Sequence, residues 1–174
     1  NLKNSRLIID FLDYEKKENV DALILVKGTF KKDSPINFNL ISLIEKKNII
    51  SFKNLNLSKD FKLISVDDFK FNYLNNKKIK NQIILKKSNS NYSIEGKSFD
   101  ATKLINKVMD NDNKNSSLFS NFNNKISLKI NKTYIDKVNF INNLSGTLSF
   151  KSNKINDLSL KSTFPNDKKN QYIN

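Results

Sequence analysis

The sequence predicts a mainly β protein, an antiparallel curved sheet or groove of consecutive hairpins with one short α-helix at about residues 98–109. Two observations support this prediction. Runs of alternating apolar and polar residues, rich in Ile, Phe, Val and Tyr, occur along most of the chain. Clusters of Asn, Asp, Ser and Lys separate these runs and act as turns, because the chain has only 3 Gly and 2 Pro.

The strands can be assigned in order along the chain. A continuous apolar run within 20–30 predicts either a strand buried on both faces or a helix. Alternation predicts further strands at 36–44, 49–57, 69–73, 79–87 and 125–130. Turn clusters lie at 45–48, 75–78, 88–91 and 152–154. The clearest hairpin joins 144–150 to 155–164, with Leu and Phe on one face and Ser and Thr on the other.

One segment departs from the two-residue period. Ala101, Leu104, Ile105 and Val108 have helical spacing, and Ser98 or Asp100 could cap the first turn. A polar stretch follows the helix and predicts a flexible connection. We therefore divide the chain into a strand meander at 20–97, a helical segment at 98–110, a linker at 111–117, a second strand group at 118–165 and a polar tail at 166–174.

The composition excludes much catalytic chemistry. The chain has no Cys and no His, which removes disulfides, Cys/His zinc sites, thiol nucleophiles and histidine bases. The remaining acid pairs are Asp67 with Asp68 and Asp10 with Asp13. Adjacent residues on a strand point to opposite faces, so Asp67 and Asp68 are better explained as a turn or bulge exposed to water. We expect no enzymatic activity, no cofactor and no metal site.

The charge is strongly basic, with a formal net charge of +14 and a sequence pI of about 9.8. Arg6 is the only arginine among 31 basic residues, and the lysines are spread along the whole chain. Arginine is the side chain that forms bidentate hydrogen bonds to phosphate groups and to the guanine edge. A solvated strand face therefore explains the lysines better than a nucleic-acid site, and no nucleic-acid partner is expected.

The one-sided apolar strands leave two architectures open. A second sheet could cover the apolar face, as in a β-sandwich, or the sheet could stay open and bind acyl chains. The longest uninterrupted apolar stretch, Ala22 to Val26, is far too short to span a membrane. Because the chain begins at Asn1 without a signal-like segment, we expect a piece of a longer protein whose membrane anchor lies outside it.

The segment 92–105 resembles an element of the AsmA-like envelope proteins of the YhdP and TamB type. In that family a strand ends in Gly, an Asp-Ala pair follows, and a short helix begins with a Leu-Leu type pair. The matching residues here are Gly96, Asp100, Ala101, Leu104 and Ile105. Lys103 stands where the family often has Pro. The run Asn143 to Leu148 is similar to the family's repeating strands, and the resemblance extends loosely over 20–165.

The resemblance implies a long curved sheet in a protein that is anchored in the inner membrane and extends through the periplasm. It also implies a noncatalytic role in phospholipid transfer to the outer membrane and in envelope assembly, with inner- and outer-membrane envelope proteins as partners. The alternative is a basic β-sandwich that binds nucleic acid or a protein. In the lipid interpretation, acyl chains contact Phe69, Phe71, Tyr73, Ile83, Leu85, Ile126, Leu128, Ile130, Leu144, Leu148, Phe150, Leu158 and Leu160.

Overall fold

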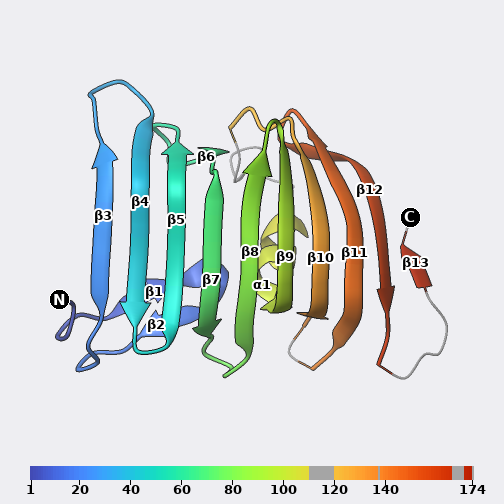
Figure 1. Cartoon of the computed structure of the whole chain (residues 1–174), viewed down its shortest axis with the longest axis horizontal. Helices are drawn as coiled ribbons and strands as arrows, with labels where there is room; N and C mark the ends of the chain where they lie inside the picture. Colours follow the sequence, from blue (N-terminus) through green and yellow to red (C-terminus); the bar gives the residue numbers. More distant parts are fainter. Residues whose placement is uncertain (110–119, 137, 166–170, 174) are drawn as a thin grey trace.

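The computed structural model describes residues 1–109, 120–136, 138–165 and 171–173, without the side chains of 107–109 and 171–173. Eleven strands form one curved sheet, and two short strands form a second, small sheet (Figure 1). The order in the large sheet is β3-β4-β5-β7-β8-β9-β10-β11-β12-β13, with β6 beside β5. The predicted fold class, mainly β with a curved, mostly antiparallel sheet and one short α-helix, is confirmed.

The elements follow the predicted order closely. The large sheet contains β3 (Leu23–Thr29), β4 (Ile36–Glu45), β5 (Asn48–Leu57), β6 (Leu63–Ser65), β7 (Asp68–Leu74), β8 (Lys80–Ser88), β9 (Asn91–Asp100), β10 (Lys125–Tyr134), β11 (Phe140–Lys151), β12 (Lys154–Thr163) and β13 (Gln171–Ile173). The small sheet contains β1 (Leu7–Ile9) and β2 (Tyr14–Lys16), joined by the 3₁₀ turn η1 (Asp10–Leu12). The α-helix α1 covers Thr102–Met109.

The predicted turn clusters make the hairpin turns. Ser152 and Asn153, which join β11 to β12, both have positive φ, at 51° and 68°. Two successive residues of this kind are typical of the type I′ turn, which matches the twist of a hairpin. Lys46 and Asn89 also have positive φ, at 52° and 55°, in the β4–β5 and β8–β9 turns. Asn, Ser and Lys therefore occupy the positive-φ turn positions that glycine often occupies in hairpins.

The pair β9 and β10 differs from the other neighbouring strand pairs of the described residues, because these two strands run parallel. A parallel pair needs a crossover connection, and α1 lies within it. The helix begins at Thr102 rather than at Ser98, since 98–100 continue β9. The predicted linker at 111–117 lies outside the described residues.

The N-terminal segment and α1 pack on one side of the large sheet. Figure 1 shows β1, β2 and α1 behind the sheet, on the same face. The strands β1 and β2, within residues 1–19, were not predicted from the sequence, and the short strand β13 lies in the predicted polar tail. The apolar run within 20–30 is a strand, yet it is an exposed edge strand and not one buried on both faces. No helix in the described part of the chain is long and apolar enough to cross a membrane.

Candidate functional site

One face of the large sheet carries most of the apolar strand side chains, and we call it the apolar face. Cross-strand pairing joins nine of its residues into a line from β3 to β12, which we call the middle row. Its members, in order across the sheet, are Val26, Ile41, Phe52, Phe69, Leu85, Ile94, Leu128, Gly146 and Leu160. Neighbouring strands lie about 4.8 Å apart, so the row is roughly 38 Å long.

The middle row lies between two clusters of packed side chains. The first cluster joins η1, β2 and α1 to the sheet, and the second includes Phe122, which precedes β10. Phe52, Phe69 and Ile94 pack against both clusters. Leu85 is the one buried side chain of the row, Val26 is exposed, and the others are partly exposed. The row is therefore an apolar track that protein covers only in part.

All thirteen residues predicted to contact lipid lie on the apolar face. Pairings such as Phe71–Ile83, Ile130–Leu144 and Leu148–Leu158 place them there. Seven of them are buried against protein: Phe71, Tyr73, Ile83, Leu85, Ile126, Ile130 and Leu144. The other six are partly exposed: Phe69, Leu128, Leu148, Phe150, Leu158 and Leu160. A ligand on this face could touch the second group directly, whereas the first group forms the core beneath the covering segments.

Two tyrosines attach the N-terminal segment to the apolar face. The rings of Tyr14 and Tyr73 meet edge to face, with 5.6 Å between their centroids. The Tyr73 hydroxyl donates a 2.9 Å hydrogen bond to the carbonyl oxygen of Leu12, and the Tyr14 hydroxyl donates to Glu45. Burial, followed by the charges of Asp100 and Asp13, raises the pKa of Tyr73 well above its usual value. Both tyrosines therefore act as neutral hydrogen-bond donors.

A buried lysine closes the N-terminal loop. Lys16 is fully buried, and its ammonium group donates to the carbonyl oxygens of Leu2, Lys3 and Ser5, at 3.0 Å for Lys3 and 2.6 Å for Ser5. Three carbonyls satisfy the three donors of an ammonium group. This role could not be predicted from the sequence, because one lysine among thirty has no pattern that marks it as buried.

Asp100, from the family-like element, is the centre of a buried polar network at the start of α1. Its carboxylate accepts hydrogen bonds of 2.8 Å from both Asn75 and Lys77, and Thr102 donates to it from its backbone nitrogen at 3.1 Å and from its hydroxyl. Asn81 accepts a 2.8 Å bond from the Asp100 backbone nitrogen. Burial by itself raises the pKa of Asp100, but the bonds from Lys77 and Thr102 outweigh it and hold the pKa below its usual value. Asp100 is thus the cap of α1, one of the two predicted caps.

Among the other residues that carry the family resemblance, Ala101, Ile105 and Gly146 have structural roles. Ala101 is buried and Ile105 packs against the first cluster, while Leu104 is 38% exposed. Gly146 has a φ of +143°, and a Cβ there would lie 2.0 Å from the carbonyl oxygen of Ser159. Only glycine fits this position of the middle row, because neighbouring backbone occupies the space of a side chain.

The acid pairs do not form a shared site. Asp67 lies at the bend before β7, where it accepts a 2.9 Å bond from Asn54 and contacts Lys87 at 3.5 Å. Asp68 is the first residue of β7. Asp10 forms an ion pair with Lys103 at 3.3 Å, which joins η1 to α1. These contacts attach one segment to another.

The opposite face of the large sheet is polar over β7 to β12, and we call it the polar face. One line across it pairs Lys70 with Ile84, then Glu95, Lys129, Ser145 and Lys161. A second line pairs Lys86 with Ser93, Ser127, Thr147 and Ser159. Over these strands, alternation therefore separates an apolar face from a basic, hydroxyl-rich face.

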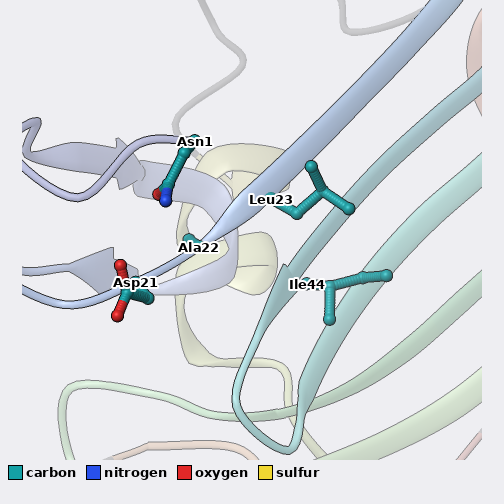
Figure 2. Close-up of a pocket in the computed structure, with 5 residues that line it drawn as sticks. All are labelled: Asn1, Asp21, Ala22, Leu23 and Ile44. Atoms are coloured by element: carbon teal, nitrogen blue, oxygen red, sulfur yellow. The ribbon is translucent and has the colours of Figure 1, made fainter.

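The β3 end of the sheet differs from the rest. A small open pocket of about 290 Å³ lies there, lined by Asn1, Asp21, Ala22, Leu23 and Ile44. Figure 2 shows the polar side chains of Asn1 and Asp21 on one side and the apolar Leu23 and Ile44 on the other. The pocket has no cluster of polar groups that would hold a specific small ligand.

No family model, curated protein or solved structure matches this chain.

Proposed function

We propose that this chain is a noncatalytic segment of an AsmA-like envelope protein that supports phospholipid transfer between the inner and outer membranes and envelope assembly. Acyl chains lie along the middle row, in a protein of the periplasm whose membrane anchor is outside this segment. Phospholipid is the ligand, and inner- and outer-membrane envelope proteins are the partners. The observation that carries the proposal is the middle row, a partly exposed apolar line that crosses nine strands.

The dimensions of the row suit an acyl chain. A bilayer has a hydrocarbon core of about 30 Å, so one acyl chain spans roughly 15 Å. The row is more than twice that length, and it runs across the strands, so that every strand adds a contact. Burial of each CH₂ group contributes about 0.8 kcal/mol, which gives useful affinity without a closed pocket.

The charge distribution supports phospholipid as the ligand. Lys154 and Lys161 lie on the polar face of β12, whose apolar face carries Leu158 and Leu160, so a headgroup reaches these lysines around the β12 side of the sheet. A lysine near a lipid surface contributes about 1 kcal/mol toward anionic headgroups. Acyl chains on the apolar face and headgroups beside the lysines at the β12 end would use both properties of the sheet.

Photocrosslinking tests the position of the ligand without changing charge. A benzophenone amino acid at Leu128, in the middle row, is expected to crosslink phospholipid in cells and in vesicles. The matched control is Ile84, an apolar residue on the opposite, polar face that is 38% exposed. Equal crosslinking at both positions would contradict the proposal, because it would show adsorption without a preferred face.

Lipid content gives a second, independent test. Native mass spectrometry of the chain purified without added lipid, with thin-layer analysis of its organic extract, is expected to detect bound phospholipid. Leu160→Lys is expected to lower that content by about tenfold, and Ile84→Lys to leave it unchanged. A folded, lipid-free chain that binds single-stranded nucleic acid in low salt would instead favour the basic domain of the alternative interpretation.

A further inference from the structure

The edge strand β3 exposes apolar side chains on both of its faces. Ile24 and Val26 are 38% and 54% exposed on the apolar face, where Val26 pairs with Ile41. Leu23 and Leu25, on the opposite face, are 46% and 41% exposed. Within the described residues β3 pairs only with β4, so its outer row of backbone N–H and C=O groups has no partner strand.

This edge lacks the usual protection along half of its length. Natural edge strands are commonly protected by lysine, proline or a bulge. In β3 the register shift falls between Lys27 and Gly28, so lysine and bulge protect only the second half. The half from Leu23 to Val26 combines free backbone groups with apolar side chains on both faces. A strand that pairs there must itself be apolar on both faces.

β3 itself meets this requirement, and we propose that β3 pairs antiparallel with β3 of a second copy of the chain, about a two-fold axis at Leu25. Leu25 then faces Leu25 of the second copy, and Ile24 faces Val26 of the second copy. Each Lys27 lies beside Leu23 of the other chain, so the two ammonium groups are kept apart. The pairing stays within β3 and avoids Ala22, whose carbonyl oxygen already accepts a 2.9 Å bond from Leu2.

Charge complementarity favours the antiparallel arrangement. Glu18 and Asp21 precede β3 and outnumber Lys17 there, whereas Lys27, Lys31 and Lys32 lie toward its other end, where the one acid, Asp33, already pairs with Lys59. Antiparallel pairing brings the acidic end of each copy beside the basic end of the other, twice in the dimer. Parallel pairing would set acidic against acidic and basic against basic, which is unfavourable.

The dimer is a closed assembly, and its apolar face continues from one copy to the other. A two-fold axis perpendicular to the sheet keeps both apolar faces on the same side and brings the Val26 ends of the two middle rows together. At the other side of the sheet, β13 already pairs with Leu160 to Ser162 of β12. The β3 pairing is isologous, since the same strand of both copies uses up its own edge, and it therefore yields a closed dimer and not a fibre. This inference needs no bound lipid and goes beyond the proposed function.

Disulfide trapping tests the pairing directly, because the chain has no cysteine. Leu25→Cys places two thiols opposite each other at the axis and is expected to form a covalent dimer under mild oxidation. Leu23→Cys is the matched control on the same face of the same strand, where its neighbour is Lys27 of the second copy. Faster crosslinking of Leu23→Cys than of Leu25→Cys would overturn the proposal.

Sedimentation of the delipidated chain tests the dimer without any new bond. The expected mass is twice the 20.1 kDa of one chain, and it falls to the monomer value on dilution. Asp21→Lys and Lys27→Glu are each expected to raise the dissociation constant about threefold to tenfold, and the double variant to restore it. Ile155→Lys, an apolar residue 43% exposed on β12, is expected to leave the dimer intact. A monomer at every concentration, or a dimer lost in Ile155→Lys, would overturn the proposal.

Discussion

Strands β7 and β12 follow the same alternation on the apolar face, yet they differ in how deeply their side chains are buried. On β7, Phe71 and Tyr73 are 4% and 0% exposed. On β12, Leu158 and Leu160 are partly exposed and belong to neither packed cluster. The difference arises because η1 and β2 pack over β7. Alternation decides which side of the sheet a residue faces, and a covering segment from elsewhere in the chain decides whether it is buried.

The largest expected effect is a truncation in the covered region. Phe71→Ala removes a ring that stacks on Phe69, with 4.3 Å between ring centroids, and meets Phe52 edge to face. A buried Phe→Ala change typically costs about 3–5 kcal/mol. Urea unfolding is expected to show that loss in the free energy of unfolding. A smaller loss than that caused by Leu158→Ala would contradict the deeper burial of β7 relative to β12.

The next effect concerns the cap of α1, which belongs to the covered region. Asp100→Ala leaves Lys77 and Asn75 without their acceptor in a buried site, and is expected to destabilise the fold by about 2–4 kcal/mol. Amide exchange in α1 should rise first, because the helix loses its cap. Exchange in β11 and β12 is expected to change least and serves as the internal control.

The lowered pKa of Asp100 also predicts that the stability of the fold depends on pH in acid. Its pKa is lower in the folded than in the unfolded chain, so its contribution is fully present above the unfolded value of about 3.9. The contribution is lost as the pH falls through the folded pKa. The free energy of unfolding should therefore fall below about pH 4, and Asp100→Asn should flatten that part of the profile. An unchanged slope in the variant would show that other carboxylates cause the acid loss.

A smaller effect is expected for the lysine that holds the N-terminal loop over the sheet. Lys16→Met keeps much of the side-chain volume but removes the ammonium donor that the Leu2, Lys3 and Ser5 carbonyls share, and among the described residues only the Leu2 carbonyl keeps a second donor, the Ser5 backbone nitrogen. The expected cost is about 1–3 kcal/mol, measured by thermal unfolding. Lys17→Met changes the same charge at an exposed position and is expected to have almost no effect.

The smallest effect is expected at the open end of the apolar face. Leu158→Ala should cost at most about 1.5 kcal/mol, because the side chain is only partly buried. The same substitution is expected to weaken phospholipid binding. Calorimetry and lipid content measured on one sample would separate the two, and a large loss of stability at unchanged lipid content would place Leu158 in the core.

Much of the fold could be predicted from the sequence because alternation and turn chemistry are local properties. The pairing of 144–150 with 155–164 across Ser152 and Asn153 needed only these two signals. The prediction was wrong where burial depends on tertiary packing. The run that forms β3 was expected to be either a strand buried on both faces or a helix, and it is an exposed edge strand. The N-terminal strands were missed, because three-residue strands are too short to show a period.

The candidate site divides in the same way. The sequence placed all thirteen predicted residues on one face, since the two-residue period fixes the side of each strand. It could not show that Ile83 is buried while Leu160 is partly exposed, because the covering segments lie far from both in the chain.

The sequence by itself therefore determined the strands, their turns and the side that each residue faces, because these depend on neighbours within a few positions. The tertiary structure alone decided three further properties. It ran β9 and β10 parallel around α1, it covered the centre of the apolar face with η1 and β2, and it left β3 at the edge. Each of these properties depends on contacts between segments that are distant in the chain, and the local alternation of apolar and polar residues does not predict such contacts.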